Sequence, residues 1–597
     1  MCAGRKGRQQ LLAMRLAETL LLALVHLAGC IAIVGLSFSA TADSCTNAVP
    51  GQKQLLWGDL HVHTAYSLDA WAFGATATPR DAYAFARGQS LRLANGELKT
   101  IDRPLDFVAV TDHPETWDQM YTCTDPELAD NAHCTEMRAL HKDRQSLKVF
   151  YNYLIPMVSA QPPKLPEFCD AETGNCTIAR TKQWRRAQYA ANEANEPCEF
   201  TALIGYEWTA TPGGHHWHRN VIFRSDAVTP QAYDFVRFPT VHGLWGQLDK
   251  HCLAQDGCGV LTIPHNINWA DGGPTFAIET ETDQQRALRS RFERVAEIFQ
   301  EKGGSECLPE RQEDLDDDCN FNLIKQNPGT ARLGDTSGRA PAEAWQQARS
   351  SYYRTLLGRG LVASRAGDNP LMLGAIASTD THFGTPGRVA EADYKRGIST
   401  MFATDEEQLA NVDFNPGGLV AVWAEENTRA GVFDALQRRE VYGTSGPRIK
   451  LRFGVADKTA CKNPQATLDV PMGGSINAAP GDAPWFTVQV AKDAHQIAKV
   501  EIIKGELVHG QVREQVIKVA SYAKGRATAC EIWQDTDLDA TAPAYWYARV
   551  SEVPTPRWSK HLCESAKLCE KFPDADVLSS ERAWSSPIWQ VPQDTTN

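Results

Sequence analysis

Short apolar runs that end in a histidine or an acidic residue recur along this chain and constrain its fold more than any other feature. The runs are rich in Val, Ile and Leu and are bounded by polar, Gly or Pro residues, which predicts buried strands. Six runs and their closing residues follow this pattern: LLWGDLHVH (His61, His63), FVAVTDH (His113), ALIGYE (Glu207), VLTIPH (His265), VAEIFQEKGGSE (Glu306) and AIASTDTH (Asp380, His382). Because the carboxyl ends of successive strands meet at one mouth of an α/β barrel, side chains far apart in sequence converge there. The pattern therefore predicts a cluster of metal-type ligands at one end of a parallel sheet or barrel.

The types and spacing of these residues favour metal binding. His61 and His63 are two residues apart, so both side chains point to the same face of a strand. Asp69 follows closely enough to fold back over the same site, and Asp380 and His382 add an acid and imidazole pair. Imidazoles and carboxylates without thiolates suit Zn, Mn or Fe. Since a catalytic zinc uses about three protein ligands and one water, the surplus of candidates predicts two or three divalent ions.

These residues resemble the motifs of the PHP superfamily, named for polymerase and histidinol phosphatase, over roughly Leu56 to His382. Its motifs begin with His-x-His and a further His or Asp, continue through His, Glu, His and His, and close with Asp-x-His. The strings GDLHVHTAYSLDA, GYEW…HRNVIF and YGTSGPRI are more particularly similar to an uncharacterised branch of that superfamily, a domain of unknown function. The resemblance implies a distorted (β/α)7 barrel of TIM type. It also implies nine metal ligands, which are His61, His63, Asp69, His113, Glu207, His218, His265, Asp380 and His382.

The ligand in the GGHHWHRN segment has three candidates, His215, His216 and His218. The spacing from Glu207 and the following Arg-Asn-Val-Ile-Phe strand favour His218. His216 would then line the mouth as a donor or be an ordinary loop histidine. For Asp112, beside His113, we weigh a role in orienting a ligand against that of an ordinary residue at a strand end.

The residues we expect to act in catalysis are Asp69, His218, Arg388 and Arg448. Phosphoryl transfer needs positive donors, and Arg388 and Arg448 each follow a Gly/Pro turn near the mouth. The alternative for each arginine is a bridge between the barrel and the next domain. Glu306 either holds a metal-bound water or substrate hydroxyl, or caps a helix.

Several aromatic residues lie within a few positions of the expected ligands. They are expected either to wall an apolar pocket for an aromatic or lipid-like leaving group, or to serve ordinary packing around the mouth. These residues are Trp71, Phe73, Trp208, Trp217 and Trp269.

The chain divides by texture into two predicted domains after an export signal. Residues 54–446 contain all the strand-plus-ligand units and predict the hydrolase barrel, with a polar, Cys-containing insertion at 115–200 that caps the mouth. Residues 449–592 contain short strands without intervening helices, which favours an antiparallel β-sandwich. The predicted fold class is therefore α/β, with a small β-sandwich at the C-terminal end.

Residues 1–42 combine basic residues, an apolar run from Leu20 to Leu36 and a small-x-small site at Ala40-Thr41-Ala42, which predicts a cleaved signal peptide. A lipobox at Leu27–Cys30 and a retained membrane anchor are the alternatives. The formal net charge of -13 gives no basic footprint for nucleic acid. We therefore expect an exported protein, periplasmic or extracellular, with no nucleic-acid partner and with membrane contact only through its N-terminal segment.

The cysteines agree with export. The chain has 16 cysteines, and 14 remain without Cys2 and Cys30, an even number suited to an oxidising compartment. No Cys-x-x-Cys occurs, which disfavours a thiolate metal site. We expect bridges between the pairs 123/134, 169/176, 252/258, 307/319 and 563/569, with 461/530 and 45/198 completing seven.

The expected function is that of an exported metal-dependent hydrolase, a phosphoesterase in which a metal-bound hydroxide attacks phosphorus at a di- or trinuclear site. Its expected partner is a small-molecule anionic ester. Because a fold does not fix a substrate, hydrolysis of another ester or amide, such as a sulfate ester, is one alternative. A non-catalytic exported metal-binding protein is the other, and it requires closed metal coordination.

Overall fold

The computed structural model describes Cys45 and residues 51–592, apart from residues 126–130, 161, 163–164, 170–173, 271–275, 309–315, 324–348, 365–368, 395–403 and 464–467. All the elements below belong to one unit, Asn47–Asn597. The expected signal peptide lies outside the described residues. Within the part of the chain that is described, no helix is long and apolar enough to cross a membrane.

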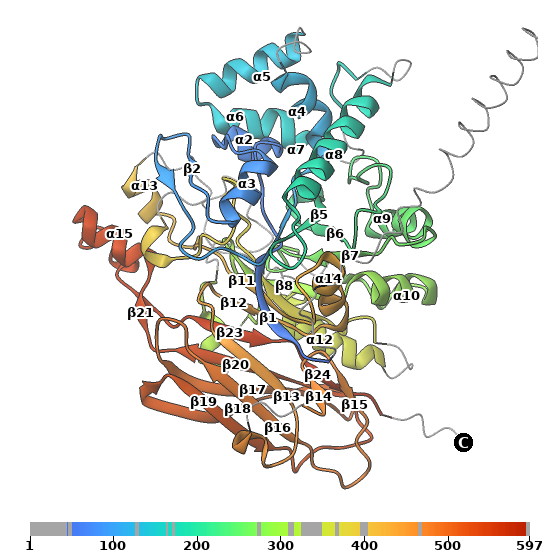
Figure 1. The fold of residues 1–597 in the computed structure, drawn as a ribbon, viewed down its shortest axis with the longest axis vertical. Helices are drawn as coiled ribbons and strands as arrows, with labels where there is room; N and C mark the ends of the chain where they lie inside the picture. The colour runs from blue at the N-terminus through green and yellow to red at the C-terminus, as the bar shows by residue number, and fades with distance from the viewer. Residues whose placement is uncertain are drawn as a thin grey trace, which may run out of the picture. The chain divides into compact units, whose positions relative to one another are not determined.

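A large mixed sheet forms the centre of the fold (Figure 1). Strands β1, β4 and β5 run parallel, whereas β6, β7, β11 and β12 each join a neighbour in antiparallel orientation. The bounds of these strands are β1 (Gln54–Asp59), β4 (Phe107–Val110), β5 (Thr201–Trp208), β6 (Arg219–Phe223), β7 (Val260–Pro264), β11 (Leu419–Ala424) and β12 (Val441–Thr444). The ligand-bearing half of the chain is thus a mixed α/β fold, as the sequence predicted.

A second sheet contacts the large sheet at two of the strands named above, β7 and β12. It contains β8 (Val295–Gln300), β9 (Gly303–Gly304) and β10 (Gly374–Ala377), with β8 and β10 parallel. β8 contacts β7, and β10 contacts β12. One apolar cluster takes a side chain from each of nine strands: Leu56, Phe107, Leu203, Ile222, Leu261, Val295, Ile376, Val420 and Val441. The closed (β/α)7 barrel stays a prediction, and these contacts are the ones that it requires.

The parallel strands form because their residues can be buried on both faces. All eight residues of β5 are buried, and its sequence TALIGYEW is apolar except for a few positions. Such continuous apolar runs are typical of parallel strands covered on both sides. Gly58 in β1 lets the ring of Phe107 in β4 approach, since a Cβ at Gly58 would lie 2.3 Å from that ring.

Helices connect and cover these strands. α3 begins after a capping box in which Thr78 and Asp81 exchange hydrogen bonds, which fixes its first turn. Among the described residues, the α-helices outside the expected insertion are α2 (Leu68–Ala72), α3 (Pro79–Ala86), α9 (Val241–Leu248), α10 (Asp283–Phe292), α12 (Tyr353–Ala363), α13 (Asp405–Leu409), α14 (Arg429–Arg438) and α15 (Trp558–Ala566).

The expected insertion at 115–200 is helical and packs on the segment that carries Asp69. Its helices α4 (Trp117–Thr124), α5 (Ala132–Lys142), α6 (Ser146–Val149), α7 (Ile155–Val158) and α8 (Asn175–Ala194) group together in Figure 1. The ring of His141 in α5 stacks on Trp71 of α2, with ring centroids 3.8 Å apart, and lies within hydrogen-bonding distance of its carbonyl oxygen. The insertion therefore supports the short helix that presents Asp69.

The C-terminal part consists mainly of antiparallel strands, as the sequence predicted, but the expectation that no helix intervenes is wrong, since α15 lies between two of its strands. The described strands are β13 (Lys450–Val455), β14 (Val470–Pro471), β15 (Ser475–Ile476), β16 (Trp485–Ala491), β17 (Ile497–Val508), β18 (Gln511–Arg526), β19 (Thr528–Gln534), β20 (Ala544–Glu552), β21 (Thr555–Pro556), β22 (Leu578–Ser579), β23 (Arg582–Ser585) and β24 (Ile588–Gln590). β13, β14, β16 and β19 form a separate sheet, which contacts the large sheet where Phe486 meets Trp546, with ring centroids 4.9 Å apart. The sandwich itself stays a prediction.

The large sheet continues across the expected domain boundary. β12 pairs with β23 antiparallel, so Tyr442 lies opposite Ser585 and Thr444 opposite Ala583. The sequence pattern changes near residue 449 from predicted strands alternating with helices to predicted strands alone, but the backbone hydrogen bonding of the large sheet continues beyond this point. The C-terminal strands are consequently part of the framework that holds the ligand-bearing half.

Six of the seven expected disulfide bridges are confirmed. They join Cys123–Cys134, Cys169–Cys176, Cys252–Cys258, Cys307–Cys319, Cys461–Cys530 and Cys563–Cys569. Cys45 and Cys198 are also disulfide-bonded. Bridges in this number are typical of an oxidising environment, whereas the periplasmic or extracellular location stays a prediction.

Candidate metal centre

All nine side chains that the sequence singled out as ligands lie in one buried cluster. Most of them lie within a few residues of the end or the start of a central strand, where the backbone enters or leaves the sheet. Their positions are His61 and His63 after β1, Asp69 in α2, His113 after β4, Glu207 near the end of β5, His218 before β6, His265 after β7, and Asp380 and His382 after β10.

Glu207 lies at the middle of this cluster and faces two groups of histidines. Its Oε2 is 3.1 Å from Nε2 of His61 and 3.2 Å from Nε2 of His63. Its Oε1 is 2.8 Å from Nδ1 of His218 and 3.3 Å from Nε2 of His265. Each oxygen thus belongs to a different set of ligand atoms, and each set is compact enough to hold one ion. In the GGHHWHRN segment, His218, the histidine that the spacing favoured, makes this contact with Glu207.

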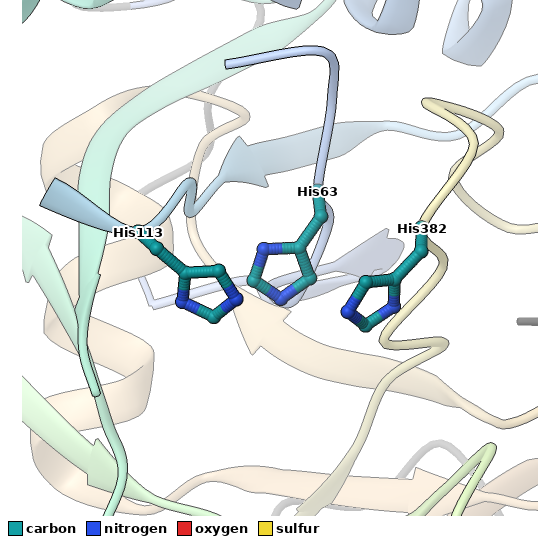
Figure 2. Close-up of side chains that lie close together, drawn as sticks. All are labelled: His63, His113 and His382. Atoms are coloured by element: carbon teal, nitrogen blue, oxygen red, sulfur yellow. The ribbon is translucent and has the colours of Figure 1, made fainter. Parts of the chain in front are cut away.

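A third set of ligand atoms consists of His63, His113 and His382 (Figure 2). Their rings come from three separate segments, and the ring of His63 stacks on each of the others, with centroids 4.3 Å from His113 and 4.4 Å from His382. Oδ2 of Asp69 lies 3.1 Å from Nε2 of His113 and 3.4 Å from Nε2 of His382. Asp69 and these histidines therefore form a site next to the one at Glu207.

Asp380 joins the cluster in a strained backbone conformation. Its φ is 58°, a left-handed value that costs a non-glycine residue about 1–3 kcal/mol. The backbone N–H of Asp380 donates to the carbonyl oxygen of His61, which holds the strained residue in place. Its Oδ1 lies 3.2 Å from Nε2 of His61 and 3.3 Å from Nε2 of His63. Strain of this kind is typical of functional sites, where the surrounding structure enforces it.

Two carboxylates that sequence reasoning missed hold the outer nitrogens of the histidines. Nδ1 of His61 lies 3.0 Å from Oε1 of Glu297, and Nδ1 of His382 lies 3.1 Å from Oε1 of Glu301. A histidine that donates from Nδ1 to a carboxylate keeps its Nε2 lone pair free for a metal. The signal that could have revealed Glu297 is its place as a buried acid inside the apolar strand β8, VAEIFQ.

Hydroxyl groups orient two further histidines. The hydroxyl of Ser67 lies 3.0 Å from Nδ1 of His63 and donates to Asp112, which also accepts two hydrogen bonds from Thr64. Thr209 lies 2.5 Å from Nδ1 of His113, and its hydroxyl is within hydrogen-bonding distance of Oε1 of Glu207. Asp112 therefore acts on His63 indirectly, because it accepts the hydrogen bond of the Ser67 hydroxyl that contacts His63.

The ionisation of the cluster follows from burial and mutual charge. Burial would raise the pKa of Glu207, but the charges of His113, His265 and His218 hold it well below its usual range. Burial likewise opposes the positive form of His61, yet Asp380 and Glu297 hold its pKa well above the ordinary value. The acids of the cluster are therefore anionic, and they attract positive charge to its centre.

The cluster also fits the metal ions that the sequence implied. Buried atoms without a hydrogen-bond partner include Nε2 of His63, both ring nitrogens of His265 and Oδ1 of Asp380. An unsatisfied buried polar atom costs about 1–3 kcal/mol, so several of them in one place indicate a missing partner. Imidazole nitrogens and carboxylate oxygens are ligands for Zn, Mn or Fe, and these atoms point at one another. The residues therefore fit divalent ions.

The two arginines expected to bind the substrate anion have other partners. Arg388 pairs with Asp393, with Nε 2.7 Å from Oδ2. Arg448 donates to the carbonyl oxygens of Arg103 and Pro104. Among the contacts of the described residues, neither arginine joins the ligand cluster. A Gly/Pro turn predicts the presence of a loop, but not the direction of its side chains.

Glu306 lies apart from the cluster as well. β9 turns back on β8, so that Phe299 pairs with Gly304, and the chain leaves the mouth before it reaches Glu306. Glu306 accepts hydrogen bonds from Arg354 at 2.9 Å and from the indole of Trp584 at 2.7 Å. It is part of a buried ion network with the C-terminal strands, not a residue at the mouth.

The aromatic residues near the ligands divide into several groups. Trp208 and Trp217 line a pocket of about 220 Å³, together with Val241 and Glu281. Trp269 packs on His216, with ring centroids 4.9 Å apart. Trp71 and Phe73 instead face the helical insertion through His141 and Phe150, which is ordinary packing.

Comparison with known proteins places the chain in a family. The family described as "Protein of unknown function (DUF3604)" matches residues 50–527 and 520–592. No curated protein matches the chain. One similar solved structure is that of a two-domain protein containing predicted PHP-like metal-dependent phosphoesterase from Bacteroides vulgatus ATCC 8482. It is 10% identical to this chain, and the match covers 83% of this chain and 90% of that chain. Its TM-score of 0.29 is too low to carry an argument. Because the family match spans most of the chain, the chain belongs to the DUF3604 family.

Proposed function

We propose that this protein is a metal-dependent hydrolase whose catalytic centre is the cluster around Glu207. The observation that carries the proposal is the position of Glu207, whose two oxygens face different groups of buried histidines. Adjacent sets of ligand atoms that share one carboxylate are suited to neighbouring ions. Neighbouring ions are typical of enzymes that hydrolyse phosphate esters and amides.

The protein residues prepare the centre for this chemistry. Bound divalent ions supply Lewis acidity, which activates water and neutralises charge on the reacting group. Glu297 and Glu301 keep Nε2 of their histidines free to bind metal, and Ser67 orients His63. Because these contacts are buried, the ligand atoms are held before substrate arrives, so little reorganisation is needed.

The substrate we propose is a small-molecule phosphoester. An in-line displacement at phosphorus is the reaction that closely spaced ions serve best, because they stabilise both the attacking and the leaving oxygen. The PHP resemblance of the sequence motifs supports the same choice. A sulfate ester, whose central atom is also tetrahedral, is the alternative to be tested beside it.

The test combines metal analysis with hydrolysis assays on the purified full chain. Phosphomonoesters, phosphodiesters and a sulfate ester are assayed for the wild type, His61→Ala and Asp380→Ala. His495→Ala serves as the control, because this histidine is exposed in the loop between β16 and β17. We expect two or more ions per chain and phosphoester turnover that both ligand variants abolish and the control retains.

Other outcomes have definite meanings. Turnover of the sulfate ester alone would assign the chemistry to the alternative substrate class. Stoichiometric metal without turnover of any ester would favour a non-catalytic metal-binding protein. An absence of stoichiometric metal in the wild type would refute the centre.

A further inference from the structure

Lys302 brings a positive charge into contact with the candidate centre. It follows β8 and Glu301, and its ammonium group donates to Oδ2 of Asp380. Oδ1 of the same carboxylate faces His61 and His63, so Lys302 lies behind a ligand but next to the ions that the ligand would hold.

The ammonium group of Lys302 has capacity for a second partner. An ammonium has three donors, and Asp380 takes one of them. The next carboxylate, Oε1 of Glu301, lies 3.9 Å from Nζ, which is beyond hydrogen-bonding distance. The side chain of Lys302 is 14% exposed, so it is not sealed in the core as Asp380 is.

The backbone around Lys302 is fixed, which makes the position of its charge definite. Asn268 donates from Nδ2 to the carbonyl oxygen of Lys302 at 2.9 Å. Asn415 donates to the carbonyl oxygens of Gln300 and Glu301, both at 3.1 Å. A side chain held on such a segment loses little entropy when it binds a ligand.

His216 is linked to the segment of Lys302 through the loop that carries Asn268 and Trp269. Its backbone N–H donates to the carbonyl oxygen of Trp269, the neighbour of Asn268, and its ring centroid is 4.8 Å from that of His218. Its Nδ1 is buried without a hydrogen-bond partner, as is the indole nitrogen of Trp269. These groups lie beside the ligand cluster, at His218, and on the loop that holds the backbone of Lys302, where they are suited to meet a polar group of a ligand.

We propose that Lys302 and His216 form the binding site for the tetrahedral oxyanion of the substrate, a phosphate or sulfate group. Nζ of Lys302 donates to a non-bridging oxygen, while Asp380 keeps the ammonium in place. The ring of His216 provides a second contact to the same group. This inference rests on the proposed function, because the oxyanion belongs to the ester that the centre hydrolyses.

The test measures anion binding, which does not depend on turnover. Isothermal titration calorimetry is carried out on the metal-loaded full chain with inorganic phosphate and, separately, with inorganic sulfate. The variants are Lys302→Met, Lys302→Arg and His216→Phe, with metal content determined for each. Lys504→Met is the matched control, since Lys504 is also buried and pairs with a carboxylate, Asp535, in the C-terminal part.

We expect Lys302→Met to weaken anion binding about 10- to 100-fold, the range for a hydrogen bond to a charged group, with metal content unchanged. Lys302→Arg should restore most of the affinity, because it keeps the charge. His216→Phe keeps the packing on Trp269 and should weaken binding about 2- to 10-fold, as expected for a neutral hydrogen bond. Lys504→Met should bind both anions as the wild type does.

The results separate this inference from the proposed function. Wild-type affinity in Lys302→Met, or a loss of affinity that only follows a loss of metal, overturns the role of Lys302. If the wild type hydrolyses no ester but its anion binding depends on Lys302, the proposed function fails and the binding site stands. The anion that binds more tightly to the wild type and loses more affinity in Lys302→Met, phosphate or sulfate, identifies the substrate class. KM in Lys302→Met should rise more than kcat falls.

Discussion

Substitution of Glu297 tests how the buried carboxylates outside the ligand set control metal affinity. The side chain of Glu297 is fully buried, and its oxygens lie 3.0 and 3.3 Å from Nδ1 of His61. Nε2 of His61 faces Glu207 and Asp380 at 3.1 and 3.2 Å. Glu297 therefore fixes the ring so that Nδ1 carries the proton and Nε2 presents its lone pair to the metal.

The size of the effect follows from what each variant leaves behind. Loss of such an outer partner typically weakens metal binding 10- to 100-fold, or about 1.4–2.7 kcal/mol. Glu297→Gln keeps a neutral acceptor for Nδ1, so we expect a loss near tenfold. Glu297→Ala leaves Nδ1 of His61 unpaired and its ring free to turn, so we expect a loss near 100-fold.

The assay is competition for Zn²⁺ between the metal-depleted chain and a chromophoric chelator. Glu506→Gln is the control, because Glu506 is another buried carboxylate, paired with Lys504 and Arg513 in the C-terminal part. An unchanged dissociation constant in Glu297→Ala would refute the reasoning, and so would an equal loss in Glu506→Gln, because the effect would then reflect general destabilisation.

Three further predictions concern stability. Glu306→Gln removes one buried negative charge from Arg354 and Arg549, which both keep Asp316 as a partner, and should cost about 1–3 kcal/mol of unfolding free energy in urea, whereas metal content should not change. Burial, Glu581 and Asp493 raise the pKa of Glu552 to about 8, so its folded form holds a proton that an unfolded glutamate, with a pKa near 4.3, releases. The stability that this proton contributes is complete below about pH 4 and is lost as the pH rises to 8. The melting temperature of Glu552→Gln should therefore rise relative to that of the wild type between pH 5 and 9. Parallel plots of melting temperature against pH for the two proteins would contradict this. Chelation of the metal should lower the melting temperature, and Zn²⁺ or Mn²⁺ should restore it, because ligands that bind only the folded state stabilise it.

Much of the candidate site could be predicted because its residues follow the ends of apolar strands. The sequence shows where a strand ends in a histidine or an acid, and strands that run parallel bring those ends together. His218 was harder to assign, since neighbouring histidines have the same chemistry. The contact of His218 with Glu207 separates it from His215 and His216, and no local pattern contains that contact.

Two of the residues that sequence reasoning missed, Glu301 and Lys302, lie where the end of a strand is not visible in the pattern. The run VAEIFQEKGGSE suggested that Glu306 was its closing residue, but β8 ends at Gln300 and turns back through β9. Glu301 and Lys302 are therefore the residues that reach the mouth. The pairing of β12 with β23 was equally hidden, because it joins segments far apart in the chain.

The C-terminal strands help to position the centre through the segment that follows β8. Glu306 binds Tyr547 and Arg549 of β20 and Trp584 of β23, so these strands hold the chain a few residues beyond Lys302. Glu301, which orients His382, lies in this same segment, and Glu297, which orients His61, lies in β8 just before it. The contacts of Glu306 fix the chain just after the carboxylates that orient the two histidines. The C-terminal part therefore belongs to the framework of the centre through Glu306 and through the pairing of β12 with β23, although it supplies none of the nine expected ligands.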